Sequence, residues 1–202
     1  KGKYYTDYID LESFADQWLF YELNEENSVN SSVYYYKDSD ICGDGKLHAS
    51  WPWDMEHSLT REGGAASSWF AAASDLKPEG YWMQFYHHRD FAEAVYKEWM
   101  TKFVPALEKA LNPETEYDPD GISSLDWYLG YYGTDAQINE SRWNGSGFAE
   151  KLEKIRRIYT VRLDFLTEAL GLYDTDYIYF YKENGILYGV NAQEESIPVE
   201  NP

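Results

Sequence analysis

Two acidic residues that follow a predicted β-strand are the first candidates for chemistry in this chain. Asp54 and Glu56 are separated by one residue and come directly after the strand-like run 46–51. In an extended stretch such residues point to the same side, so the two carboxylates would repel one another unless a cation lay between them. Carboxylate oxygens are the ligands that Mg²⁺ and Mn²⁺ prefer. The pair therefore predicts a divalent metal site, although such a pair is also typical of an ordinary solvated turn.

The elements that must position this pair are expected to be mostly helical. Asp10 is a good N-cap for a helix over 11–25, and the β-rich runs 33–37 and 46–51 predict a hairpin around the turn-rich residues 38–45. Apolar residues at helical spacing predict three further helices, at about 89–111, 123–139 and 148–171. Pro105 should kink or break the first of these three, and Ser123 should cap the second.

The carboxy-terminal residues change character. Asn184-Gly185 lies between the β-rich runs 177–182 and 186–190, which predicts a second hairpin, and residues 192–202 are expected to form a polar linker. The expected fold class is therefore α+β and mainly helical, with two small β-hairpins. We expect one unit over residues 1–175, followed by a hairpin and polar tail over 176–202.

Composition excludes several classes of function. The 202 residues carry a formal net charge of −19, with 17 basic against 36 acidic residues, and no basic cluster that could neutralise a nucleic-acid backbone. No apolar run reaches the roughly 20 residues that a membrane span requires. The single cysteine, Cys42, excludes an internal disulfide, and the four histidines show no spacing typical of a zinc site.

The run from Ser32 to Glu56 resembles the CotH kinase family. The family carries an "S-x-Y-x-Y-K-D" strand, a short loop, and then "K-L-x-x-G-P-x-W-D-F-D", and the chain reads SSVYYYKDSD…GKLHASWPWDME. Similar landmarks occur in the same order over roughly residues 8–170. They are the helix Asp10–Glu22, the run Arg89-Asp90-Phe91 with Trp99, the run from Asn139 to Trp143, and the run from Arg162 to Leu166.

The resemblance implies an atypical-kinase C-lobe-like helical domain that phosphorylates extracellular or spore-coat proteins. Asp54 would take the role of the kinase metal-binding aspartate, with Glu56 in place of the second family aspartate. Asp54 and Lys37 would help to bind the nucleotide. The implied cofactors are Mg or Mn and ATP, the implied partner is a protein substrate or a member of a spore-coat or extracellular complex, and the implied location is extracellular, at the cell surface or in the spore coat.

The chain departs from the family in two ways. Asn27 stands where the family has its presumed catalytic aspartate, and an amide cannot accept a substrate proton, so Glu25 or Glu26 would have to substitute. The family's amino-terminal lobe, which should hold the ATP-facing lysine, is not visible before Lys1, so this chain alone is expected to be inactive.

Two other readings stay open. A non-catalytic, structural or interaction module of the same lineage would explain Asn27. A carbohydrate-binding domain would explain the 18% of aromatic residues, because exposed rings stack on sugars. The rings that could do so are those of Trp51, Trp53, Trp69, Tyr81 and Trp82.

Overall fold

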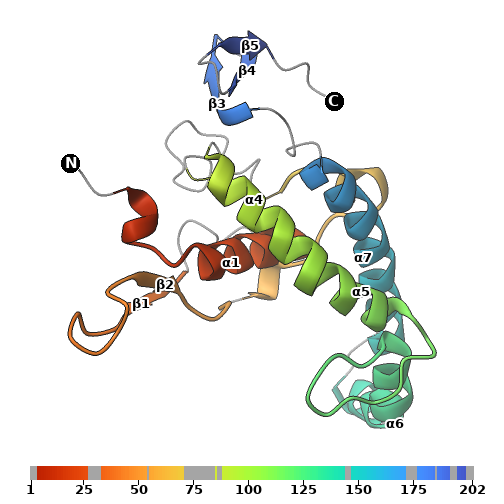
Figure 1. Cartoon of the computed structure of the whole chain (residues 1–202). Coiled ribbons are helices and arrows are strands. Elements are labelled where there is room, and N and C mark those ends of the chain that lie inside the picture. The colour runs from red at the N-terminus through yellow and green to blue at the C-terminus, as the bar shows by residue number, and fades with distance from the viewer. Residues whose placement is uncertain are drawn as a thin grey trace.

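A computed structural model describes residues 4–26, 33–53, 55–70, 85, 88–143, 147–171, 177–184, 186–191 and 195–198, with only the backbone at positions 56, 177–183, 187 and 189–191. Within these ranges the chain is mainly helical and carries two small antiparallel sheets, which confirms the predicted α+β class (Figure 1). The β1–β2 hairpin lies near the amino terminus, and the sheet β3–β4–β5 lies near the carboxy terminus.

Helix α1, Leu11–Asn24, is the central element of the fold. Its predicted cap is confirmed, because Oδ1 of Asp10 accepts a hydrogen bond from the Ser13 amide at 2.9 Å. The buried positions are not confined to one stripe, because α1 contacts α4 (Arg89–Glu98), α7 (Phe148–Gly171) and β2. A helix enclosed in this way is apolar around most of its circumference. Its buried apolar residues are Phe14, Ala15, Trp18, Leu19, Tyr21 and Leu23.

The helix predicted over 89–111 has a π turn in its middle. Helix α4 continues into the π-helical turn Trp99–Phe103 and then into α5, Val104–Leu111. Pro105, which was expected to kink or break the helix, is the second residue of α5. A proline has no amide hydrogen, and its ring collides with the carbonyl four residues before it in a regular α-helix. The α-helical pattern is therefore interrupted just before the proline, where the Val104 amide bonds the Trp99 carbonyl instead.

The amino-terminal hairpin is confirmed and is attached directly to α1. Strands β1, Tyr35–Lys37, and β2, Leu47–Ala49, pair antiparallel. The Leu47 amide donates to the Tyr8 carbonyl at 2.7 Å, and the Asp10 amide donates to the Leu47 carbonyl at 2.8 Å. The Ala49 amide donates to Oγ of Ser13 at 3.1 Å. Hydrogen bonds thus hold β2 against the residues just before α1 and against the first turn of α1.

Helices α6, Leu125–Trp143, and α7 pack against each other at the far end of the molecule (Figure 1). The cap of α6 is Ser124 rather than the predicted Ser123, because Oγ of Ser124 accepts from the Trp127 amide at 3.0 Å. Ser123 instead accepts a bond from the amide of Asp118 in the preceding connector. The predicted end of α7 at Gly171 is confirmed.

The second predicted hairpin is confirmed and carries an additional strand. Strands β3, Tyr177–Glu183, and β4, Ile186–Asn191, pair antiparallel around Asn184, whose φ of 52° is the left-handed conformation that such a turn requires. The polar linker predicted over 192–202 is wrong at Ser196–Pro198, which forms β5 on the free edge of β4. A strand of three residues is too short to show a period of two in the sequence.

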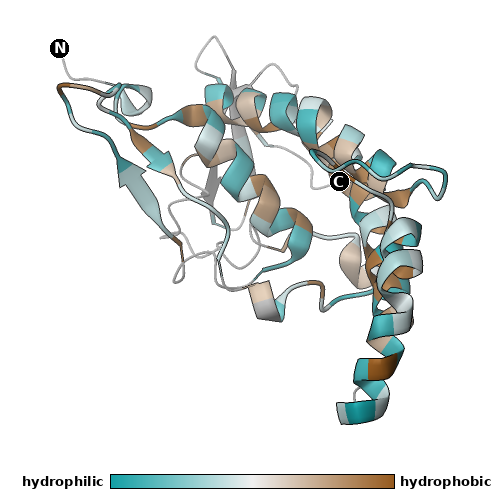
Figure 2. Ribbon diagram, turned by 90° about the horizontal axis from the view of Figure 1, so that it is seen from below, coloured by the Kyte–Doolittle hydropathy of each residue, from teal (hydrophilic) through white to brown (hydrophobic). Residues whose placement is uncertain are grey.

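The hydrophobic core lies where α1, α4 and α7 meet. Figure 2 shows hydrophobic and hydrophilic residues interspersed along the helices, as expected for elements that each bury one part of their surface. Trp18, Phe91, Trp99 and Leu166 are fully buried in this core. In the described part of the chain, no helix combines the length and apolar character needed to cross a bilayer.

Candidate functional site

Three glutamates are fully buried where α1 ends. Glu22 lies in the last turn of the helix, and Glu25 and Glu26 follow directly after it. Glu25 has φ 55° and ψ 41°, a left-handed conformation that costs a non-glycine residue about 1 kcal/mol or more. Buried carboxylates are stable only when they are paired and hydrogen-bonded. The partners of these three residues therefore show which segments of the chain pack at this end of α1.

Glu22 pairs with Arg162 of α7. Nη2 of Arg162 lies 2.7 Å from Oε1 of Glu22, and both side chains are fully buried. The same guanidinium donates to the carbonyls of Ala66 and Ser68, at 3.0 and 2.6 Å. The amide of Phe70 donates to Oε1 of Glu22 at 2.7 Å. This pair therefore joins α1, α7 and the segment 66–70 within one buried network.

Glu25 and Glu26 hold the segment that follows residue 54. Oε2 of Glu25 accepts from the Arg61 amide at 2.9 Å, and Oε1 lies 3.3 Å from Nε of the same residue. Oγ of Ser58 donates to Oε2 of Glu26 at 3.0 Å. The Leu59 amide donates to the carbonyl of Asn24 at 2.8 Å. Segment 58–61 is thus bound to the end of α1 by both side-chain and main-chain hydrogen bonds.

The structure describes only some of the residues that the sequence predicts for the site. Asp54 and Asn27 lie outside the described residues, and so does the side chain of Glu56. The expected extended stretch through residue 56 is wrong, because Met55–His57 forms a 3₁₀ turn that the bond from the Ser58 amide to the Met55 carbonyl supports. Successive residues of such a turn rotate by about 120°, so the spacing no longer argues that positions 54 and 56 face the same side.

Lys37 is the last residue of β1, and it pairs with a residue other than the buried glutamates. Its ammonium pairs with Asp40 of the hairpin loop, and its side chain is partly exposed. Among the described residues, Lys37 makes no hydrogen bond or ion pair with the end of α1. A role for Lys37 in nucleotide binding therefore stays a prediction.

Asn24 and Tyr159 add a neutral contact to the same region. The hydroxyl of Tyr159 donates to Oδ1 of Asn24 at 2.8 Å. Burial raises the pKa of Tyr159 from its ordinary value of 10.0 to about 12. The folded chain therefore favours the neutral phenol more than the unfolded chain does, and this contribution to stability should be complete below pH 10 and lost as the pH rises from 10 to about 12.

We expect Tyr159→Phe to remove this alkaline dependence. At neutral pH the variant should lose about 1 kcal/mol, since Oδ1 of Asn24 is left without its donor. Between pH 10 and 12 the wild type should lose an additional 2–3 kcal/mol or so that the variant retains. Urea unfolding of both proteins at several pH values measures the difference, in which the other tyrosines cancel. If the free energy of unfolding differs between the two proteins by the same amount at every pH, the raised pKa does not belong to Tyr159.

Two other groups of side chains have the composition of metal ligands. In the first, Glu12 and Asp16 of α1 approach Glu98 of α4. Nζ of Lys102 lies 2.8, 2.8 and 2.7 Å from oxygens of these three carboxylates. The ammonium therefore occupies the position between the carboxylates, and we assign this group as an ion-pair network rather than a metal site.

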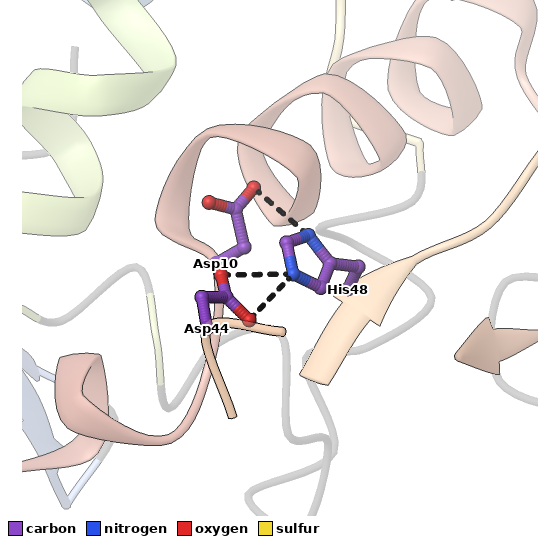
Figure 3. A group of neighbouring side chains, drawn as sticks. All are labelled: Asp10, Asp44 and His48. Carbon is purple, nitrogen blue, oxygen red and sulfur yellow. Dashed lines mark hydrogen bonds and ion pairs between the residues drawn. The ribbon is translucent and has the colours of Figure 1, made fainter. Parts of the chain in front are cut away.

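The second group joins the hairpin to the start of α1. Figure 3 shows the His48 ring between the carboxylates of Asp10 and Asp44. Nε2 lies 3.0 and 3.2 Å from the two oxygens of Asp44, while Nδ1 lies 3.7 Å from Oδ1 of Asp10. Both ring nitrogens thus face carboxylates, and the same Asp10 oxygen caps α1. These contacts explain why the hairpin lies against the first turn of the helix.

The aromatic residues considered for carbohydrate binding differ in their exposure. Trp51 and Trp53 are exposed, at 87% and 57%, whereas Trp69 packs against Trp18 and Phe165 of the interior. Tyr81 and Trp82 lie outside the described residues. Helix α6 carries a further set of exposed aromatic side chains that were not considered for carbohydrate binding, namely Tyr128, Tyr131, Tyr132 and Trp143.

The arginines that pair with the buried glutamates were not among the residues predicted for the site. One signal was available for Arg162, since it stands four residues from Ile158 and from Leu166 on the buried face of α7. A charged residue within an apolar stripe indicates a buried partner. No comparable signal marks Arg61, which lies in an irregular segment.

Comparison with models of protein families, with curated proteins and with solved structures found no significant match. The resemblance to the CotH kinase family therefore depends on the residues quoted above and on their order.

Proposed function

We propose that this chain is the carboxy-terminal part of a CotH-like atypical protein kinase, which binds divalent metal and the phosphates of ATP to phosphorylate extracellular or spore-coat proteins. One observation supports this function best. The segment 58–61, which follows the proposed metal-binding Asp54, is bonded to Asn24, Glu25 and Glu26, which directly precede Asn27. Segments 24–26 and 58–61 thus meet in the fold, and each lies close in sequence to a residue to which the resemblance assigns a role, base chemistry for Asn27 and metal binding for Asp54.

In this proposal Glu25 and Glu26 are positioning residues. Both carboxylates are fully buried and already bonded to Arg61 and Ser58, so they hold the segment after Asp54 against α1. Glu25 and Leu59 both have left-handed backbone conformations at this contact. Such conformations are concentrated at functional sites, where the surrounding structure compensates for their cost.

The donor set of the proposed metal site is chemically suitable for the implied ion. Asp54 and Glu56 offer carboxylate oxygens, which Mg²⁺ and Mn²⁺ prefer over nitrogen or sulfur. When bound, such an ion would neutralise charge on the ATP phosphates. The contribution of the chain itself is to hold segment 58–61, which follows these two residues, through three hydrogen bonds to the end of α1.

A second candidate function is a non-catalytic module of the same lineage within a spore-coat or extracellular complex. Asn27 favours this alternative, because its amide stands where the family has its presumed base. The two candidates differ in whether phosphate is transferred, and the second one requires neither nucleotide nor metal.

Calorimetric titration of the full-length protein with Mg-ATP tests metal and nucleotide binding. We expect binding in the wild type and at least a tenfold or so weaker affinity in Asp54→Ala, since one carboxylate ligand of the metal is lost. Asp135→Ala is the matched control, because Asp135 is an exposed aspartate on α6. Binding that is equal in the two variants, or absent from the wild type, would contradict the kinase proposal.

A further inference from the structure

The hairpin and the residues that follow it carry four exposed aromatic rings. They are between 52% and 87% exposed and belong to Tyr34, Tyr36, Trp51 and Trp53. Side chains alternate between the two faces of an extended strand, and Tyr35 of β1 stacks on Phe14 of the core. Tyr34 and Tyr36, one position to either side, therefore lie on the face that the core does not cover. Exposed apolar patches of this kind are typical of binding surfaces.

A groove beside α1 extends this aromatic surface. Its volume is about 500 Å³, a size common among sites for small ligands. Tyr36 and Trp51 line it from the side of the hairpin, whereas Phe20 of α1 and Phe103 of the π turn line it from the helices. Among the described residues the ring of Trp51 has no aromatic neighbour, so a ligand in the groove can stack on its indole.

The charges of the groove favour a neutral ligand. The charged residues of its lining are Asp16 and Lys102, and Oδ2 of Asp16 lies 2.8 Å from Nζ of Lys102. The lining therefore offers an ionic ligand of either sign no uncompensated counter-charge. The net charge of −19 on the whole chain further disfavours an anion.

Each of the four rings also has a polar group at its tip, a hydroxyl in the tyrosines and an indole N–H in the tryptophans. None of these groups makes a hydrogen bond with another described residue, so an occupant that covers the rings has to replace their bonds to water. A purely apolar partner would leave each covered group without a bond, at a cost of about 1–3 kcal/mol. The surface therefore suits an occupant that combines an apolar face with hydrogen-bonding groups at its edge.

We propose that this surface and its groove bind a neutral oligosaccharide. A pyranose ring carries C–H bonds on its faces and hydroxyl groups around its edge. Its faces would pack on the rings of Trp51 and Tyr36, whose aromatic faces are negative, while its hydroxyls would bond the polar tips. Tyr34 and Tyr36 are about 7 Å apart along the strand, which is more than the width of one sugar, so several linked sugars fit better than a single one. This inference does not depend on the kinase proposal.

Calorimetric titration of the full-length protein with cello-, xylo-, chito- and malto-oligosaccharides of about six units tests the proposal. We expect at least one of them to bind with a dissociation constant below about 1 mM. Its affinity should be the same at about 50 and 500 mM salt, because the ligand is neutral. Trp51→Ala should weaken this ligand about tenfold, since the indole is the most exposed of the four rings. Trp143→Ala is the matched control, because Trp143 is 73% exposed on α6, and it should bind as the wild type does.

Three results would overturn the proposal. The first is that no oligosaccharide of the panel binds, and the second is equal affinity of the wild type and Trp51→Ala, which would place the sugar elsewhere. The third is binding of a short blocked peptide of leucine and phenylalanine that Trp51→Ala abolishes, in a protein that binds no sugar. That outcome would assign the surface to a partner protein. Because Trp51 is almost fully exposed, its truncation should leave the fold intact, which far-UV circular dichroism checks.

Discussion

Replacing Arg162 with leucine should lower the free energy of unfolding by about 3–5 kcal/mol. The substitution leaves the carboxylate of Glu22 fully buried without its counter-charge, and it removes the donors to the carbonyls of Ala66 and Ser68. The cost of the uncompensated charge is the largest contribution, because water cannot reach either side chain. We expect a loss that is large relative to the total stability of a domain of this size.

Urea unfolding followed by tryptophan fluorescence measures this effect. Arg157→Leu is the matched control on the same helix, since Arg157 is 54% exposed and pairs with the exposed Glu62. It should cost less than about 1 kcal/mol. The double variant Glu22→Leu/Arg162→Leu should lose clearly less than the sum of the single variants, because no charge then remains buried. If Arg162→Leu costs no more than Arg157→Leu, the buried pair does not have the role assigned to it.

Asn27→Asp should raise the rate of phosphate transfer by about 10²–10⁴-fold in the full-length protein. The substitution supplies a carboxylate where the resemblance expects the base that accepts the proton of the substrate hydroxyl. It changes only the side-chain amide to a carboxylate of almost the same size. The gain is expected only if the domain binds ATP and metal, so the proposed kinase function and this prediction are tested together.

Autophosphorylation with labelled ATP, in Mg²⁺ and in Mn²⁺, provides the measurement. Asn30→Asp adds the same charge three residues further along the chain and should leave the rate unchanged. Combining Asn27→Asp with Asp54→Ala should abolish the gain. A variant that binds Mg-ATP but shows no increase would instead favour the non-catalytic alternative, in which this position no longer serves catalysis.

The helices could be predicted from the sequence because their signals are local. The N-cap at Asp10, the apolar spacing of α7 and its end at Gly171 all depend on residues a few positions apart. The cap of α6 was misplaced by one residue, since Ser123 and Ser124 are equally suitable in sequence. Only the fold determines that Ser123 bonds the Asp118 amide and leaves Ser124 to cap the helix.

The buried network at the end of α1 could not be predicted, because its partners are distant in sequence. Glu22 and Arg162 are separated by 140 positions, and Arg61 reaches Glu25 from an irregular segment. No periodic pattern links such residues, and Glu25 and Glu26 read as surface charges until their partners are known. The 3₁₀ turn at Met55–His57 was missed for a related reason, since the hydrogen bonds around it come from α1 as well as from the turn itself.

The π turn within the long helix corrects the phase of its apolar repeat. Phe91, Val95, Trp99, Phe103 and Leu107 recur every four residues. In a regular α-helix such a repeat drifts by about 40° at each step, so Leu107 would lie about 160° from Phe91, nearly on the opposite side. The wider turn accommodates one extra residue and reduces this drift to roughly 60°. Leu107 consequently remains in the same core as Phe91 and Trp99, and a long run of strict four-residue spacing is itself a sequence signature of a π turn.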